Sequence, residues 1–290
     1  MQNLSSILLL VERGDQGQHA LNKALLLARH LHARLELFLC DTERYPIARL
    51  GGDGGAEDSL GERVAEAREY LRALRKSMLV TDIEVSSEAV CHVSLRTALA
   101  DKLLRGGIDL VVKAMPAIQD GRDQVAIDWP LVASCTAPLL LTRGRPWHPV
   151  PRFAAAVDLQ DRHGRALSNA ITAIGESLSH SCGAQLEILF AHAGSGAEFA
   201  PERLTTTLNA IGRAHRLDMS RLKYLNGEPT EVLPAMVAGR DYDLVAMGKP
   251  QHGEPSELCG SVAARIVKAS AGDVLFTAPV GIHRTRRVRS

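Results

Sequence analysis

This chain has few aromatic side chains and almost no net charge. Phe, Trp and Tyr make up 4% of its 290 residues, and the formal net charge is +1. Steering toward nucleic acid or membrane requires a strong charge of one sign, and single-stranded nucleic acid also needs aromatic stacking platforms. We therefore expect neither as a partner. The arginine-rich segment 281–290 is interpreted as a solvated end rather than an anion-docking arm.

Paired cysteines and long apolar runs are also missing. The five cysteines are scattered without a C-x-x-C pair, which is typical of reduced thiols in a cytosolic protein. No apolar run approaches the ~20 residues that a membrane helix needs. Residues 7–11 are apolar, but the run is short, has no basic residue before it and ends at Glu12, unlike a signal segment. We expect a cytoplasmic protein without membrane insertion.

Several motifs of catalysis and metal binding are absent. The G-x-G-x-x-G fingerprint does not follow the first strand predicted in either half, no P-loop occurs, and no G-x-S-x-G elbow follows a predicted strand. Histidines and cysteines approach each other along the sequence, but without the spacing of a closed zinc site. The neighbours are His30 and His32, Cys91 and His92, and His252 and Cys259. The sequence predicts no catalytic residue and no metal ligand.

What the chain does contain is a long internal repeat. Three segments of the first half match three of the second, namely LLLVE (8–12) with AAAVD (154–158), ARLELFL (33–39) with AQLEILF (184–190), and DLVVKAM (109–115) with DLVAMGK (243–249). A repeat of this length is a duplicated domain, because solenoid repeats span about 20 to 50 residues.

The repeat divides the chain into two domains of about 140 residues, each large enough for its own core. Three prolines among residues 143–152 mark the join, as expected of a semi-rigid linker. We assign residues 1–143 to the first domain, 144–151 to the linker, 152–280 to the second domain and 281–290 to the basic tail.

Each copy alternates short apolar strands with amphipathic helices, which predicts an α/β fold with a parallel sheet covered on both faces. The predicted strands are residues 7–11, 34–40, 83–90, 109–112 and 139–142, then 153–157, 185–191, 220–225, 244–247 and 274–277. Three helices predicted in the first copy are residues 59–77, 95–104 and 125–134, and a fourth carries Leu21, Leu25, Ala28 and Leu31 at helical spacing.

In such a sheet, ligands bind beyond the carboxyl ends of the strands. Glu12 and Asp158 follow the first strand of each copy. A carboxylate there can accept hydrogen bonds from ribose hydroxyls, or it can form a turn or cap a helix. Both interpretations stay open for Asp158, whereas a turn or cap is favoured for the longer Glu12.

The segment after the fourth strand differs between the copies. In the second copy, Gly248, Gly253 and Gly260 would let backbone amides approach a bound phosphate, Ser261 follows at the start of a helix, and Lys249 could add a counter-charge. In the first copy, Val125 and Ala126 replace Gly260 and Ser261. The phosphate-binding features are therefore confined to the second copy.

These features resemble the tandem universal stress proteins across residues 4–279, and the segment from DLVVKAM to LLLTRGRPW is similar to their E-type two-domain members. The resemblance implies two doubly wound five-stranded sheets of order 3-2-1-4-5, packed as an internal pseudo-dimer along their fifth strands. The nucleotide-binding members carry an Asp after the first strand and G-x2-G-x9-G-[S/T] after the fourth. That pattern corresponds to Asp158, Gly248, Gly260 and Ser261.

The phosphate loop departs from the pattern of the family. Gln251 stands where a glycine is expected, and the span from Gly248 to Gly260 is one residue short. Pro250 and Pro255 also remove amide donors from this segment.

We therefore expect a non-enzymatic stress-response protein whose second domain binds a small ligand, with ATP or another nucleotide, accompanied by Mg²⁺, as the implied cofactor. Two alternatives remain: a carrier of an apolar or lipid-like ligand, and a slow ATP hydrolase using Asp158, Lys249 and Ser261. A second copy of the chain, forming a homodimer, is a further partner left open.

Overall fold

The computed structural model of the chain describes residues 3–42, 55–78, 82–115, 127–158, 162–192, 206, 218–249 and 261–278. In these parts, strands and helices alternate in each copy, as the hydrophobic pattern predicts. The strands are β1 (Ser6–Leu10), β2 (Arg34–Asp41), β3 (Val85–Cys91), β4 (Leu110–Ala114), β5 (Leu139–Thr142), β6 (Arg152–Val157), β7 (Gln185–His192), β8 (Leu222–Asn226), β9 (Leu244–Gly248) and β10 (Asp273–Thr277).

The helices occupy the segments between these strands. They are α1 (Asp15–Leu31), α2 (Gly55–Ser77), α3 (Leu95–Leu104), α4 (Trp129–Ser134), α5 (Arg162–Cys182), α7 (Pro229–Gly239) and α9 (Val262–Ala269), with the short 3-10 helix η2 (Met219–Arg221). None of these helices is both long enough and apolar enough to cross a membrane within the described parts of the chain.

Two expected boundaries shift for local reasons. The helix predicted over residues 125–134 begins at Trp129, because the Asp128 side chain accepts a hydrogen bond from the Leu131 amide and caps it there. The strand predicted over residues 220–225 begins at Leu222, because η2 occupies the three residues before it.

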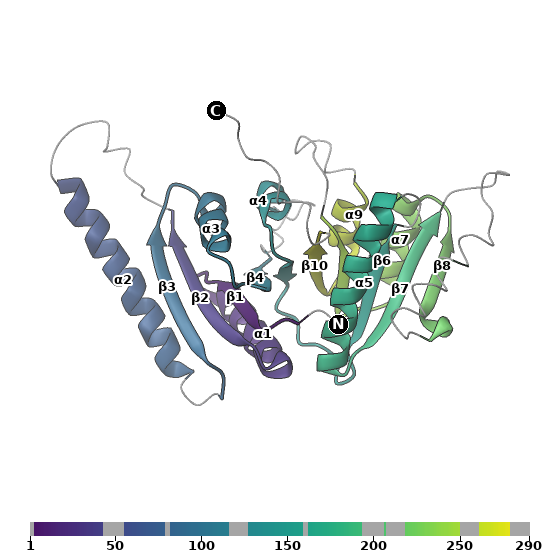
Figure 1. Cartoon of the computed structure of the whole chain (residues 1–290), viewed down its shortest axis with the longest axis horizontal. Coiled ribbons are helices and arrows are strands. Elements are labelled where there is room, and N and C mark those ends of the chain that lie inside the picture. Colours follow the sequence, from purple (N-terminus) through teal and green to yellow (C-terminus); the bar gives the residue numbers. More distant parts are fainter. Residues whose placement is uncertain are drawn as a thin grey trace.

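Both copies have the strand order that the resemblance implies, but they form one sheet instead of two. The order is β3-β2-β1-β4-β5-β10-β9-β6-β7-β8, and every neighbouring pair is parallel except β5 with β10. These two strands pair antiparallel, with Leu140 opposite Leu275. In Figure 1, β10 lies in the middle of the molecule and β3 and β8 lie toward opposite ends. The pairing satisfies backbone groups that two exposed edge strands would leave unpaired.

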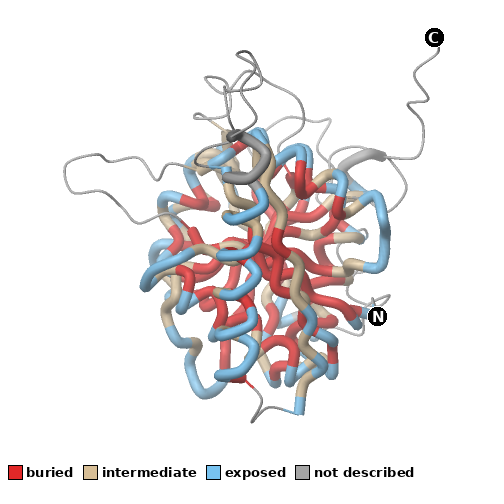
Figure 2. The backbone as a smooth tube through the Cα atoms, turned by 90° about the vertical axis from the view of Figure 1, so that its left-hand side faces the viewer, coloured by how far each residue is buried: buried red, intermediate tan, exposed pale blue. Residues whose placement is uncertain are grey.

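Side chains from alternate positions of the strands form a separate core on each face of the sheet. Ile7 and Leu9 of β1 pack on the face covered by α1, α2 and α5, whereas Leu8 and Leu10 pack on the face covered by α3, α4, α7 and α9. Figure 2 shows this buried interior running through the molecule beneath an exposed outer layer. The continuous apolar runs of the sequence reflect burial on both faces.

Two matched positions of the repeat have structural roles. Asp109 accepts hydrogen bonds from the Ser5 and Ser6 amides, and Asp243 accepts them from the His148 and Arg152 amides. In each copy this aspartate, which stands just before the fourth strand, satisfies amides at the entry to the first strand. The aspartate that begins the matched segments DLVVKAM and DLVAMGK therefore has the same role in both copies, since it accepts hydrogen bonds from main-chain amides near the start of the first strand.

The contact between the copies is reinforced on both sides of the sheet. On one face α1 packs against α5. On the other, the Trp129 ring packs edge-on against Phe276, with ring centroids 5.9 Å apart. Trp129 belongs to the core, and Trp147 of the linker packs edge-on against Phe153 at 5.0 Å. The internal pseudo-dimer is therefore a continuous sheet with packed side chains above and below.

Candidate functional site

A cavity of about 270 Å³ lies at the carboxyl ends of β6 and β9 in the second copy. Asp158, Gly248, Lys249 and Ser261 all line it. These residues come from the end of β6, the end of β9 and the start of α9, so the sheet topology brings together positions far apart in sequence. Two other expected site residues, Gly253 and Gly260, lie outside the described residues.

Asp158 stands at the mouth of this cavity, directly after β6, and its side chain is exposed. The hydroxyl of Ser168, which is fully buried on α5, donates a hydrogen bond to the Asp158 main-chain oxygen. That bond fixes the backbone of the turn. The carboxylate therefore starts from the carboxyl end of a central strand, where ligands of such sheets bind.

Gly248 closes β9 against the first turns of α5. A Cβ at this position would lie 2.5 Å from Cδ2 of Leu167, well inside van der Waals contact. Leu167 also lines the cavity. The absence of a side chain at Gly248 thus keeps the strand end close to α5 without displacing the cavity wall.

Ser261 caps the helix that follows the cavity. Its hydroxyl oxygen accepts a hydrogen bond from the Ala264 amide at 3.2 Å, and α9 starts at the next residue. A serine at this position stabilises the helix start, where the remaining amides carry partial positive charge. The predicted phosphate contact and the helix cap therefore fall on the same residue.

The expected counter-charge from Lys249 is not found in this structure. Its side chain leaves the cavity and crosses to the first copy, where the ammonium donates hydrogen bonds to the main-chain oxygens of Cys135 and, at 2.7 Å, Ala137. Only 8% of the residue is exposed, and burial lowers the pKa of Lys249. Lysine carries a long side chain that can reach a neighbouring domain, which is why its position at the strand end misled the prediction.

The wall of the cavity is mostly apolar, which sequence reasoning did not predict. The apolar residues that line it are Ala156, Val157, Leu167, Ile171, Ala191, Pro229, Leu233, Met247, Val262, Ala263 and Ile266. They come from six separate elements or loops, so no short motif could reveal them. Such a wall suits a flat or apolar part of a ligand.

Comparison with solved structures assigns this architecture. Over 95% of the chain, it superposes on a protein of unknown function from Pseudomonas aeruginosa PAO1, with 21% identity, 93% of that chain covered and a TM-score of 0.71. A putative universal stress protein from Pseudomonas aeruginosa UCBPP-PA14 matches 95% of the chain at 21% identity, with 94% of its own chain covered and a TM-score of 0.69. A universal stress protein from Archaeoglobus fulgidus DSM 4304 matches 96% at 12% identity, over its whole length, with a TM-score of 0.71.

The chain has the tandem universal stress protein fold. No protein-family model and no curated protein sequence matches it. The likeness extends over both copies, since each of these structures covers nearly the whole chain.

Within this universal stress protein fold, the equivalent position in the first copy carries an ion pair. Lys113 of β4 donates a hydrogen bond to the Glu12 carboxylate, which follows β1. The matched segments DLVVKAM and DLVAMGK make Lys113 the counterpart of Met247. The strand register agrees, since Leu9 pairs with Val112 in the first copy and Ala155 pairs with Ala246 in the second. The first copy thus places a charged pair where the second has an acid beside an apolar wall. The alignment of DLVVKAM with DLVAMGK was the available signal for this difference.

Burial suppresses the reactivity of two described thiols, Cys40 and Cys182. Burial raises the pKa of Cys40 to about 11 and that of Cys182 to about 12, so both thiols stay protonated at neutral pH. Among the residues that the structure describes, no three His, Cys, Asp or Glu side chains are grouped so that they could hold a metal ion.

Proposed function

We propose that this chain is a non-enzymatic stress-response protein that binds a nucleotide, with ATP as the first candidate, in its second copy. The observation that carries the proposal is the shared cavity of Asp158, Gly248 and Ser261. The stress-response role rests on the likeness of the whole fold to universal stress proteins.

Each part of a nucleotide has a complementary surface in this cavity. The Asp158 carboxylate can accept hydrogen bonds from ribose hydroxyls, and the apolar wall can cover the base. The start of α9, capped by Ser261, faces the same cavity and favours negative charge. Because the Lys249 ammonium is engaged at the contact between the copies, we expect Mg²⁺ to accompany the phosphates as their counter-charge.

The cavity offers little for hydrolysis. Of the described residues that line it, Asp158 and Lys249 are the ionisable ones, and the lysine ammonium is directed away. A hydrolase needs a general base and groups that stabilise the transferred phosphoryl group. We therefore propose binding without turnover, and phosphate release from Mg²⁺–ATP above the protein-free rate would contradict this part.

Calorimetric titration with Mg²⁺–ATP tests the nucleotide site. We expect one site in the wild-type protein, an affinity at least about tenfold weaker in Asp158→Asn, and little change in Glu12→Gln. The second variant is the matched control, because it alters the corresponding acid of the first copy in the same way. No heat of binding at millimolar ATP, or equal loss in both variants, would overturn the proposal.

The apolar wall supports a second candidate function. A small apolar molecule could occupy the same cavity without contacting Asp158. Extraction of the purified protein with organic solvent, followed by mass spectrometry, distinguishes the two. Recovery of one apolar compound at near-equal molar amount, with no ATP binding, would support the carrier; recovery of a nucleotide would exclude it.

A further inference from the structure

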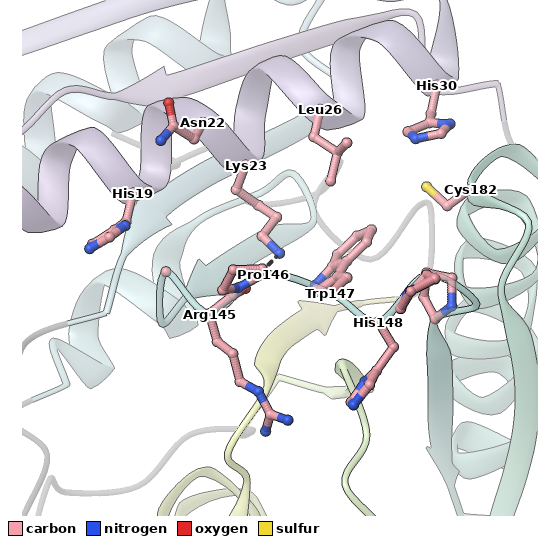
Figure 3. A pocket seen from close by; sticks show the side chains of 13 residues that line it. His19, Asn22, Lys23, Leu26, His30, Arg145, Pro146, Trp147, His148 and Cys182 are labelled. Carbon is pink, nitrogen blue, oxygen red and sulfur yellow. Dashed lines mark hydrogen bonds between the residues drawn. The ribbon is translucent and has the colours of Figure 1, made fainter.

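A larger cavity lies between the two copies, on the side of the sheet that α1 and α5 cover. Its volume is about 620 Å³, and it is lined by α1, the linker segment 144–151 and Cys182 at the end of α5. It shares no lining residue with the cavity at Asp158. In Figure 3, Lys23 and Leu26 project from α1 toward the linker that carries Trp147. The site exists because the two copies are joined in this arrangement.

The floor of this cavity is fixed by buried polar contacts. The Lys23 ammonium lies 3.2 Å from Asp273 Oδ2 and 4.0 Å from the centroid of the Trp147 ring, and it donates a hydrogen bond to the Arg145 main-chain oxygen. The Trp147 indole N–H donates to the same Asp273 oxygen at 2.9 Å. Asp273 and Lys23 are 1% and 5% exposed. The hollow is therefore preformed, which lowers the entropic cost of filling it.

The linker is held against α1 at its first residue. Gly144 has φ 79°, and a Cβ there would lie 2.5 Å from the His19 side chain. Glycine adopts this left-handed conformation without strain, and it also permits so close an approach. The start of the linker is thus packed directly against the His19 side chain of α1.

The polar groups around this cavity are donors or potential cations. Of the described residues that line it, none is acidic, whereas Lys23 and Arg145 contribute cations, three histidines contribute ring nitrogens and Asn22 contributes an amide. Asp241 holds the Arg145 guanidinium through two hydrogen bonds of 2.6 and 2.9 Å, and the His148 ring lies 2.9 Å from Asp243 and 3.3 Å from Asp241. Neither carboxylate lines the cavity. Leu26, Pro146 and Trp147 supply an apolar surface between these groups.

We propose that this linker cavity is a second binding site, which takes a small organic anion with a flat apolar part, such as an aromatic carboxylate or sulfonate. The apolar part contacts Leu26 and Trp147, and the anionic group is directed to the exposed side chains of His19, Asn22 and His30 at the rim. Because its walls come from both copies, an occupant stabilises their arrangement. Burial raises the pKa of the Cys182 thiol to about 12, so the site binds its ligand without a thiolate reaction.

Titration with 8-anilinonaphthalene-1-sulfonate, followed by its fluorescence, tests the site. We expect saturable binding to the folded protein, weakened about fivefold or more in Asn22→Asp and in His30→Asp, which place negative charge at the rim. His180→Asp is the matched control, because His180 is also exposed in the last turn of its helix but does not line the cavity. Thermal unfolding of each variant confirms that its fold is retained.

Two further measurements separate this site from other sources of fluorescence. The uncharged probe N-phenyl-1-naphthylamine should bind the wild-type protein more weakly and should be insensitive to Asn22→Asp. Ala263→Phe, which adds bulk to the apolar wall of the cavity at Asp158, should leave binding of the sulfonate unchanged. Equal affinity of the sulfonate in all rim variants, or its loss in Ala263→Phe alone, would overturn the proposal without affecting that of the nucleotide site.

Discussion

At the scale of single residues, the same position serves different purposes in the two copies. Lys249 and Met115 end the matched segments DLVAMGK and DLVVKAM, and both are buried. The lysine ends in an ammonium that donates to main-chain oxygens of the other copy. Burial of a cation among neutral acceptors is costly unless the fold offsets it, and this cost is visible in the direction of its pKa shift.

The cost of burying the Lys249 ammonium should appear in the free energy of unfolding, whose dependence on pH should differ between the wild-type protein and Lys249→Met. Burial lowers the pKa of Lys249 in the fold, whereas the unfolded chain keeps the ordinary value near 10.5. Below that value the unfolded state binds more protons, so the free energy of unfolding of the wild type should rise with pH relative to that of the variant.

Urea denaturation at intervals from pH 7 to 10.5 measures the difference. Ionisation of the Cys135 thiol, whose pKa burial raises, lowers the stability of both proteins at the alkaline end, and the comparison largely removes that effect. Parallel pH profiles for the two proteins would show that the lysine is not held in a costly environment.

At the scale of secondary-structure elements, α9 links the ligand site to local stability. It has eight residues and begins at the Ser261 cap, beside the cavity of Asp158. A helix this short depends on its cap and on its packing. The start of its counterpart α4 is capped by the Asp128 carboxylate instead, which accepts a hydrogen bond from the Leu131 amide. Serine and aspartate are both good caps, but they differ in charge.

Substitution of Ser261 separates capping from ligand binding. Ser261→Ala should lower the free energy of unfolding by about 1 kcal/mol, whereas Ser261→Asp should preserve it. The aspartate should nevertheless weaken ATP binding, because it places a negative charge where the phosphates are proposed to lie. Thermal unfolding and calorimetry on the three proteins check both parts; unchanged ATP affinity in Ser261→Asp would place the phosphates elsewhere.

At the scale of the whole molecule, the two copies behave as one body because a single sheet passes through both. The β5–β10 pair joins them, and on either side Lys249 and Lys23 connect one copy to the other. We therefore expect that the linker is not needed to hold the halves together once they have folded. Val150 of the linker is 54% exposed.

A protease site inserted beside Val150 should permit cleavage of the folded protein without separation of its halves. We expect the nicked protein to elute as one species in size-exclusion chromatography under native conditions, because the sheet and the buried contacts remain. After denaturation the two fragments should separate. Elution as two smaller species without denaturant would show that the linker, rather than the sheet, maintains the pair.

The sequence alone determined the elements, their order and the position of the candidate site. Buried strands appear as continuous apolar runs, and a duplicated run fixes a duplicated element, because local patterning reflects burial directly. Asp158, Gly248 and Ser261 could be selected because parallel strands place their carboxyl ends at one edge. The resemblance to the universal stress proteins supplied the strand order, which periodicity does not encode.

Tertiary structure alone decided how the two copies meet and where the long side chains reach. No local pattern indicates that β5 pairs with β10, that Lys249 crosses to the Cys135 and Ala137 carbonyls, or that Lys23 and Trp147 form the floor of a cavity. These features depend on contacts between residues more than a hundred positions apart. A lysine side chain can turn toward either of two surfaces, and the folded environment selects the one that satisfies its charge.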